Sequence, residues 1–312
     1  MKSIDDLLKP LVSCHNIDHP SDWDMQFGRK APLDVEIGFG MGEFLVRSAK
    51  NSPGRNFIGF EQIWERIFKT LKRIKREERL LDNIKILKMD VRVSFERLFD
   101  QKRIDNVYCL FPCPWPKKGH IKHRLFSTEF LKLVNSRLKE KGFLKIVTDF
   151  YPYYEWVLEQ SQDTGFDVTE NTVQPQYDTK FERKWMDAGQ KEFYEINMRK
   201  VRHVDLPVRR DVKLKTYKVQ DFDPLNFKFQ DQIGKCSIVF KEMIFDEKKQ
   251  KGVVYLIVSE MEMMQYFWVS IIRKDTGWRI CKTEGQNFFP TVGIAKALEL
   301  VYQSATSSTK KA

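Results

Sequence analysis

The apolar positions of this sequence follow two different periods, and the pattern changes near residue 205. Before that point, short β-branched or aromatic runs alternate with segments whose apolar residues recur at helical spacing. The predicted strands lie at 34–37, 56–60, 84–89, 107–111 and 143–147, and the predicted helices at 43–50, 64–74, 94–99, 127–139 and 153–162. This alternation predicts an α/β domain with a mostly parallel, doubly wound sheet, which binds ligands at the carboxyl ends of its strands.

The later part of the chain has the pattern of hairpins rather than of alternating strands and helices. Two more strands, at 166–172 and 193–200, complete the α/β part, and strand-like runs at 212–219, 237–245, 253–262 and 265–273 then precede a helix at 291–303. We therefore predict a leading segment at 1–30, the α/β domain at 31–203, a smaller α+β domain at 204–305 and a frayed tail at 306–312.

Composition narrows the class of protein. With 42% hydrophobic and 31% charged residues, the chain has the composition of a folded globular protein and not of a disordered one. The longest clean apolar run, 253–258, is too short to cross a bilayer, so we expect a cytoplasmic protein without a membrane partner. The five cysteines have no paired spacing, which predicts reduced thiols, no disulfide framework and no metal site.

The net charge of +11 indicates an anionic partner, with nucleic acid as the first candidate. Residues 201–312 contain 19 Lys or Arg and 13 Asp or Glu, so their net charge of +6 is about half of the excess. A lysine-rich surface that only reflects compositional bias is the competing interpretation. The basic residues between the apolar positions of 64–79 likewise form either a solvated helix face or a phosphate-contacting surface.

A candidate ligand site begins where the first strand meets a glycine turn. The sequence Glu-Ile-Gly-Phe-Gly-Met-Gly at 36–42 leads from a strand into a helix, and its glycines allow a tight turn that approaches a ligand closely. Roughly 20 residues later, Glu61 ends the second strand, where nucleotide-binding folds place an acid for the ribose hydroxyls. Asp90 ends the third strand. This arrangement predicts an adenosine-containing ligand, and a plain glycine turn beside surface acids is the alternative.

A stiff loop follows the fourth strand, at the same edge of the predicted sheet. It reads Phe-Pro-Cys-Pro-Trp-Pro-Lys-Lys-Gly-His at 111–120. Trp115 offers a face on which a base can stack, and the basic side chains after it can contact phosphates. The loop is placed to face the reactive end of a ligand held by the glycine turn. A proline-rich turn that binds nothing is the alternative.

Four motifs together resemble the bacterial-type tRNA (guanine-N7-)-methyltransferase family. They are the glycine turn at 36–42, Asn-Phe-Ile-Gly-Phe-Glu at 56–61, the proline loop at 111–120 and Thr-Lys-Phe-Glu at 179–182. The first is shared with many methyltransferases, whereas the third and fourth are specific to this family. The resemblance covers about residues 33–200. It implies a class I, Rossmann-like methyltransferase that moves a methyl group from S-adenosylmethionine to N7 of the variable-loop guanine, position 46, of tRNA.

The resemblance also implies roles for individual residues. The cofactor would be bound by Glu36, Gly38, Gly40, Gly42, Glu61, Asp90 and Cys113, and the RNA by Lys117, Asp149, Thr179, Lys180, Phe181 and Glu182. Cys113 stands where the family has an aspartate that is regarded as catalytic. Because N7 of neutral guanine already carries a free lone pair, no base is required. We expect an active enzyme that is slower unless Asp149 or Glu182 substitutes as the catalytic carboxylate.

Cys113 also leaves room for other functions. Pro112-Cys113 resembles the proline-cysteine pair of pyrimidine-C5 methyltransferases, whose thiolate adds to the ring, although the neighbouring motifs argue against this mechanism. A tRNA-binding protein without catalysis is a third possibility. The C-terminal domain would add grip on RNA or stability, or form an oligomer through Tyr266-Phe-Trp268. The sequence leaves open monomer or homodimer, and whether 179–184 is a mobile lid.

Overall fold

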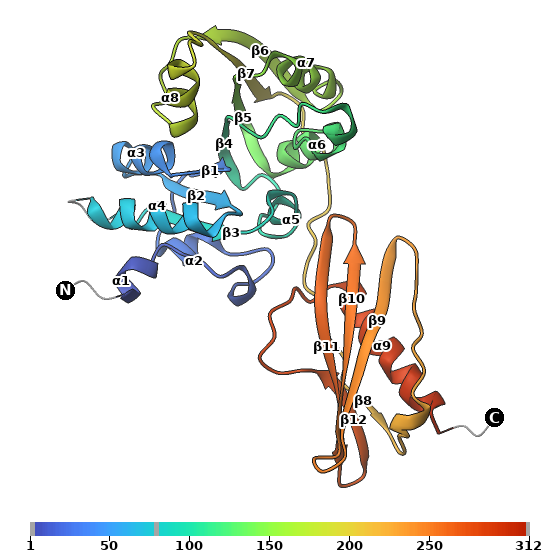
Figure 1. Ribbon diagram of the computed structural model, residues 1–312. Helices are drawn as coiled ribbons and strands as arrows, with labels where there is room; N and C mark the ends of the chain where they lie inside the picture. The colour runs from blue at the N-terminus through green and yellow to red at the C-terminus, as the bar shows by residue number, and fades with distance from the viewer. Residues whose placement is uncertain (1–3, 78–80, 310–312) are drawn as a thin grey trace. The chain divides into compact units, whose positions relative to one another are not determined.

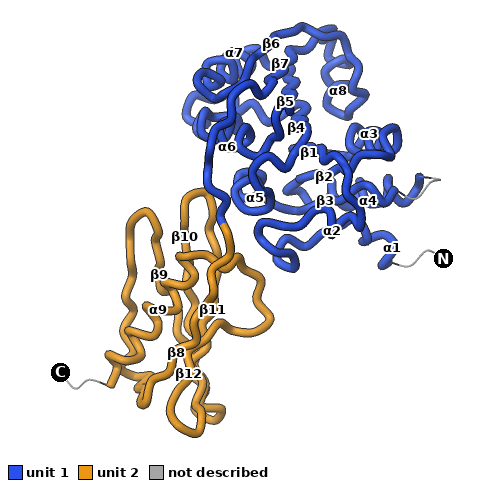
Figure 2. The backbone as a smooth tube through the Cα atoms, turned by 180° about the vertical axis from the view of Figure 1, so that it is seen from behind, with its two compact units in different colours: residues 1–209 blue, residues 210–312 orange. Residues whose placement is uncertain are grey.

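The computed structural model describes residues 4–77 and 81–309, and the chain divides into two compact units. Unit 1 comprises residues 1–209 and unit 2 residues 210–312, as coloured in Figure 2. Both predicted domains are present, but the division follows Arg209 instead of residue 203. Within the described ranges, no helix is long and apolar enough to cross a membrane.

Unit 1 is built on a seven-stranded sheet with the order β3-β2-β1-β4-β5-β7-β6 (Figure 1). Its strands are β1 (Leu33–Ile37), β2 (Asn56–Glu61), β3 (Ile84–Lys88), β4 (Ile104–Leu110), β5 (Leu138–Thr148), β6 (Phe166–Val173) and β7 (Phe193–Lys200). The first five are parallel, and β7 is antiparallel to both neighbours. This confirms the predicted mostly parallel sheet, whose order reverses beside β1, where such folds bind ligands.

Helices cover both faces of this sheet (Figure 1). They are α1 (Ile4–Leu8), η1 (Cys14–Asn16), α2 (Trp23–Phe27), α3 (Glu43–Asn51), α4 (Trp64–Arg76), α5 (Val91–Arg97), η2 (Lys118–His123), α6 (Thr128–Arg137), α7 (Tyr151–Gln160) and α8 (Lys180–Asp187). Leu45 of α3 and Leu71 of α4 belong to one core cluster with Phe57 of β2. An aromatic cluster around Phe99 packs against Phe60, which points to the opposite face of β2.

The predicted leading segment is part of unit 1. Trp23 is fully buried, stacks on Phe99 with ring centroids 5.6 Å apart, and donates its indole N–H to the Leu98 carbonyl at 2.9 Å. Leu11 forms an additional parallel bridge with Ile86 of β3. Residues 4–30 therefore complete the core, although their short elements give no regular period in the sequence. The first helix of this segment, α1, ends at Leu8.

Residues 204–209 are held on unit 1 by a buried arginine. Arg137, at the end of α6, donates Nε to the Phe95 carbonyl at 2.8 Å, Nη1 to the Leu206 carbonyl at 3.0 Å and Nη2 to the Pro207 carbonyl at 2.9 Å. Burial lowers the pKa of Arg137 to about 10, so the guanidinium is still charged at neutral pH. A buried charge is stable only when hydrogen bonds satisfy it. Because two acceptors of Arg137 are the carbonyls of Leu206 and Pro207, this segment belongs to unit 1.

A chain that ends at residue 209 is therefore expected to be more stable than one that ends at residue 203. The shorter chain lacks two carbonyl acceptors of Arg137, at a cost of about 3 kcal/mol for hydrogen bonds to a charged group. Urea unfolding of both truncated chains measures the difference, and a chain ending at residue 211 controls for length. Equal stabilities at 203 and 209 would show that solvent replaces the carbonyls fully.

Unit 2 is a five-stranded antiparallel sheet, order β8-β12-β11-β10-β9, with one long helix on its core face. Its elements are β8 (Tyr217–Val219), η3 (Pro224–Asn226), β9 (Cys236–Asp246), β10 (Lys251–Glu260), β11 (Met263–Lys274), β12 (Gly277–Lys282) and α9 (Val292–Ser307). The sequence pattern overestimated β8 and missed β12. The tail was predicted to begin at 306, but α9 continues to Ser307 and Ser308 is buried; 310–312 lie outside the described residues.

The aromatic run in β11 is divided between the two faces of the sheet. Phe267 is fully buried in the core, whereas Tyr266 is 57% exposed. Trp268 stacks on Tyr255 of β10, with ring centroids 4.6 Å apart. An oligomer interface on this strand would therefore use Tyr266 and Trp268 without Phe267, because neighbouring residues of a strand point to opposite faces.

Candidate active site

The glycine turn connects β1 to α3 through three residues with left-handed backbone. Gly38, Gly40 and Gly42 have φ angles of +69°, +55° and +71°. Gly42 is also required for packing, because a Cβ atom there would lie 2.4 Å from Cγ2 of Thr70 on α4. At Gly38, by contrast, a Cβ atom would meet nothing within 4 Å. The turn thus fixes the backbone where a ligand would approach it.

Glu36 lies at the end of β1, just before this turn, and is only 4% exposed. Its Oε2 atom has no hydrogen-bond partner among the described residues. Burial, with Glu43 and Glu61 as further negative neighbours, raises the pKa of Glu36 to about 8, although Arg47 opposes the shift. A buried carboxyl group without a partner is unfavourable on its own and suited to receive a cation from a ligand.

Glu61 ends β2, and its carboxylate supports the glycine turn. Oε2 accepts the N–H of Gly40 at 3.1 Å and Nη1 of Arg66 at 3.4 Å. Oε1 accepts the backbone N–H groups of Gln62 and Ile63 at 2.9 and 3.0 Å. A carboxylate offers about four acceptor positions, so all are in use. Ligand hydroxyls would have to replace one donor, and the contact with Arg66 is the longest.

Asp90 follows β3 and lies near Glu61 in the site. Oδ1 accepts the N–H of Arg92 at 2.8 Å and so caps α5, while Oδ2 accepts Nε2 of Gln62 at 2.9 Å. Glu36, Glu61 and Asp90 therefore stand at or just after the carboxyl ends of three adjacent parallel strands. The sequence predicted this placement, but it did not predict the hydrogen bonds that already occupy two of the three carboxylates.

A narrow pocket lies between the glycine turn and the start of α8. Its lining comes from the turn, from α4 and from the 179–181 motif, and consists of Glu36, Gly38, Phe39, Gly40, Met41, Glu43, Arg66, Leu110, Thr179, Lys180 and Phe181. The fold therefore brings the two motifs together, although they are far apart in the sequence. Figure 1 shows α8 next to α3, the helix that the turn begins.

Residues 180–187 form helix α8, which the sequence pattern did not predict. Thr179 caps this helix by accepting the N–H of Glu182 at 3.2 Å. Glu182 is 1% exposed, and its Oε1 accepts the N–H groups of Gln176 and Tyr177 at 2.8 and 3.0 Å. Arg183 donates to Glu43 at 2.9 Å, which ties α8 to α3. Thr-x-x-Glu is the capping-box pattern, a signal that could have identified this helix.

The proline loop after β4 is held by a residue that the motif analysis did not identify. Arg124 is 6% exposed, donates Nε to the Pro114 carbonyl at 3.0 Å, and lies over the ring of Trp156. Trp115 adopts a φ of +43°, and its ring centroid lies 5.2 Å from that of His123. Within this loop Cys113 is exposed as a free thiol. Arg124 thus fixes the backbone of the loop, while the side chain of Cys113 is exposed to solvent.

Asp149 follows β5, the strand next to β4. Leu110 and Val147 are paired in the register of these parallel strands, so Cys113 and Asp149 follow neighbouring strand ends. Asp149 is partly buried, and burial raises its pKa while Lys184 opposes the shift. Lys117, in contrast, is exposed on the loop. Asp149 therefore places a carboxyl group at the same edge of the sheet as Cys113.

Comparisons with known proteins agree with this geometry. The sequence model of a family described as "Putative methyltransferase" matches residues 30–195. A tRNA (guanine-N(7)-)-methyltransferase of Chlorobium phaeobacteroides is 43% identical over 55% of this chain and 84% of its own length. Proteins of the same name from Thermotoga maritima and Aquifex aeolicus are 31% and 30% identical over 92% and 87% of this chain, and 94% and 93% of their own lengths. Those two alignments extend into unit 2.

Proposed function

Because the chain belongs to the tRNA (guanine-N(7)-)-methyltransferase family, we propose that it methylates N7 of the variable-loop guanine, position 46, in tRNA. It is an S-adenosylmethionine-dependent methyltransferase. The observation that best supports the proposal is Oε2 of Glu36, a buried acceptor beside the glycine turn that has no hydrogen-bond partner in residues 4–77 and 81–309. S-Adenosylmethionine carries positive charge and an adenosine group, which fit a buried carboxylate followed by acids at two adjacent strand ends.

In the proposed function, each of the three carboxylates at the strand ends has a distinct task, and Glu36 is the one that lines the pocket. S-Adenosylmethionine supplies a methyl group made electrophilic by its sulfonium. Glu36 pairs with the positive charge of the cofactor, and Glu61 and Asp90 receive its nucleoside part. The glycine turn supplies backbone that no side chain obstructs. Cys113, in the loop that follows β4, would face the reacting end of the cofactor.

Methylation of guanine N7 requires alignment more than proton transfer. The N7 lone pair forms the new bond to carbon as the carbon–sulfur bond breaks, and the purine takes up the positive charge. A negative group held near the purine stabilises that charge. We assign this electrostatic role to Asp149. Glu182 is instead a positioning residue, because its carboxylate already accepts the N–H groups of Gln176 and Tyr177.

Four further residues are proposed to contact the RNA. Thr179, Lys180 and Phe181 line the pocket at the start of α8, and Lys117 is exposed on the proline loop. Phe181 can stack against a base, while the two lysines can approach phosphates. The hydrogen bond from Arg183 of α8 to Glu43 supports this proposal for the three residues of α8 and its cap, because it holds the start of the helix beside the pocket.

Transfer of labelled methyl groups to total tRNA, followed by nucleoside analysis, tests the proposed function. Label in 7-methylguanosine is the expected result. Label in a 5-methylpyrimidine would indicate the thiolate mechanism of Cys113 and contradict the proposal. Tight binding of tRNA without transfer of label would identify a non-catalytic binding protein. A fluoropyrimidine RNA adds a second test, because only the thiolate mechanism leaves protein covalently bound to RNA.

Replacing Cys113 by aspartate is expected to raise turnover about tenfold, which corresponds to about 1.4 kcal/mol of transition-state stabilisation. The gain should be modest because Cys113 is exposed and its charge would be screened by water. Single-turnover methylation of tRNA measures it. Cys113→Ser is the matched control and should leave the rate unchanged, whereas loss of activity in this variant would favour a thiolate nucleophile.

A further inference from the structure

Helix α4 carries five basic side chains that do not line the cofactor pocket, and four of them lie on one side of the helix. Lys69, Lys72, Arg73 and Arg76 recur at spacings of three and four residues, so they form one stripe along the exposed side of the helix. The opposite side, with Ile67 and Leu71, is buried in the core. We call these four residues the α4 stripe. Its position is compatible with either of the two readings of the sequence, a solvated face or a phosphate-binding surface.

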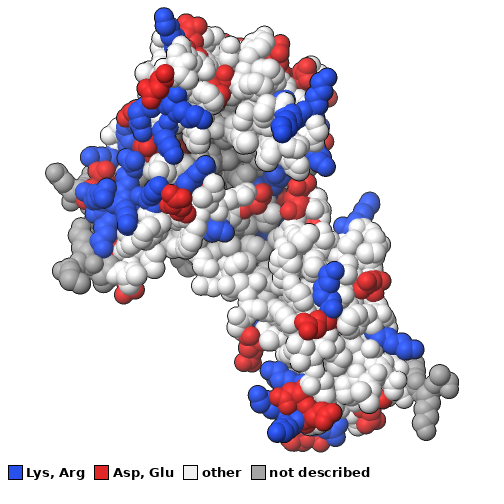
Figure 3. Space-filling view, viewed as in Figure 1, with Lys and Arg blue, Asp and Glu red and all other residues white. Residues whose placement is uncertain are grey.

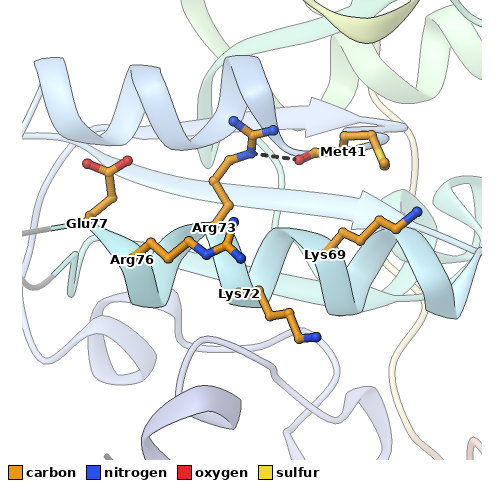
Figure 4. A pocket seen from close by; sticks show the side chains of 6 residues that line it. All are labelled: Met41, Lys69, Lys72, Arg73, Arg76 and Glu77. Atoms are coloured by element: carbon orange, nitrogen blue, oxygen red, sulfur yellow. Dashed lines mark hydrogen bonds between the residues drawn. The ribbon is translucent and has the colours of Figure 1, made fainter.

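The α4 stripe lines a groove instead of a flat surface. Together with Met41 and Glu77 it surrounds a space of about 860 Å³ (Figure 4). Arg73 reaches across this groove and donates Nε to the Met41 carbonyl at 3.1 Å. The guanidinium group of Arg73 is therefore held against the glycine turn. Because Arg66, one turn earlier on α4, lines the cofactor pocket, the groove begins beside that pocket.

A second groove of about 570 Å³ adjoins the first and shares Arg73 and Glu77 with it. It adds the basic residues Arg47, Lys50 and Arg183 and the acids Glu43 and Asp178. Basic side chains thus outnumber acidic ones in the two grooves together. Figure 3 shows Lys and Arg side chains gathered over α3, α4 and α8. A hollow surface with excess positive charge favours an extended anion over free solvent.

We propose that the α4 stripe binds the phosphate backbone of the tRNA substrate. The inference rests on the proposed function and specifies how the substrate is held. From Lys69 to Arg76 the stripe spans about 10 Å along the helix axis, the length of about three phosphates on one strand of a duplex. Such contacts position an RNA without reading its sequence. They would leave recognition of the guanine to the residues around the cofactor pocket.

The salt dependence of tRNA binding tests this inference in the full-length chain. The Lys72→Gln/Arg76→Gln variant is compared with Lys102→Gln/Lys141→Gln, which removes two exposed charges near the amino ends of β4 and β5, at the sheet edge opposite the candidate site. Loss of two phosphate contacts should reduce the slope of log affinity against log salt by about 1.8 and weaken binding about 60-fold at 0.1 M salt. The control pair should change the slope little.

Kinetics separate this role from one in the chemistry. In the α4 variant, KM for tRNA should rise while kcat and the affinity for S-adenosylmethionine stay unchanged, because neither residue lines the cofactor pocket. Equal slope changes in both variants, or none in either, would overturn the inference, as would loss of cofactor affinity. If the wild-type chain makes no 7-methylguanosine but the α4 variant shows the reduced salt slope, the proposed function is wrong and the inference that the α4 stripe binds RNA is supported. If it makes 7-methylguanosine without the effect, only the α4 stripe fails.

Discussion

At pH 8, the ligand-free Glu36→Gln variant should be more stable than the wild type and should bind S-adenosylmethionine about 10–100-fold more weakly. Both effects follow from one buried carboxyl group with a pKa raised to about 8 by burial. In the free protein its charge has no hydrogen-bond partner at Oε2 among the described residues. In the complex, the same charge pairs with a cation, and a charged hydrogen bond contributes about 1.5–3 kcal/mol.

The sign of the stability effect follows from proton linkage. Between the ordinary carboxyl pKa of 4.5 and about 8, the folded chain retains a proton on Glu36 that the unfolded chain releases. The associated stability is fully present below pH 4.5 and is lost as the pH rises through 8. The loss reaches about 4 kcal/mol at pH 8, and a neutral glutamine avoids it. Urea unfolding of both proteins at pH 5 and pH 8 should show a difference that grows with pH.

Cofactor binding should depend on pH in the opposite direction. Wild-type affinity for S-adenosylmethionine should rise between pH 6 and 8 because binding requires the ionised carboxylate, whereas the Glu36→Gln variant should lack this rise. Isothermal titration calorimetry measures both. Glu65→Gln, an exposed position on α4, serves as the control and should alter neither stability nor affinity. Unchanged cofactor affinity in Glu36→Gln would show that another group receives the cation.

The second large effect is expected for Gly42→Ala, which should cost about 2–5 kcal/mol of stability and remove most cofactor binding. The new Cβ atom would lie 2.4 Å from Cγ2 and 2.7 Å from Oγ1 of Thr70, which is fully buried. The φ of +71° adds the strain of a left-handed alanine, about 1–2 kcal/mol. Overpacking contributes about 1–3 kcal/mol more, because α4 or the turn must move.

Gly38→Ala isolates the contribution of backbone strain. Its φ of +69° is almost the same, but a Cβ atom there meets nothing within 4 Å. It should therefore cost only about 1–2 kcal/mol. Thr70→Ala, introduced into Gly42→Ala, should restore part of the lost stability. Equal losses for the two glycine variants, measured by urea unfolding and calorimetry, would show that contact with Thr70 has no effect.

The hydrophobic period of the sequence predicted the central strands of unit 1 well, because β1 and β2 are buried along their whole length. The strand predicted at 193–200 is β7 (Phe193–Lys200), and 56–60 differs from β2 by one residue. The elements that the sequence pattern did not predict are stabilised by other interactions. Helix α8 depends on its cap at Thr179 and on the ion pair between Arg183 and Glu43 of α3, and β12 on a tight hairpin with β11. Neither depends on a long apolar stripe.

The candidate site was predictable in position but not in electrostatics. Motif spacing placed Glu36, Glu61 and Asp90 at the same edge of the sheet, because parallel strands end together. It could not distinguish the carboxyl group of Glu36, which lacks a partner at Oε2, from that of Glu61, which holds the turn. Glu182 was predicted to be catalytic, and the sequence did not show that its Oε1 atom accepts two main-chain N–H groups. The hydrogen-bond partners of these carboxyl groups depend on the course of the backbone in the folded protein, which motif spacing does not specify.

The anchor at Arg137 has a consequence for protein engineering. Leu206 and Pro207 contribute only their main-chain carbonyls to this anchor, so it recognises the path of the backbone and not the identity of either side chain. A foreign domain joined after Arg209 would leave all of these contacts intact. Arg209 is thus a suitable fusion site, at which the C-terminal domain can be replaced without changing the core of the methyltransferase domain.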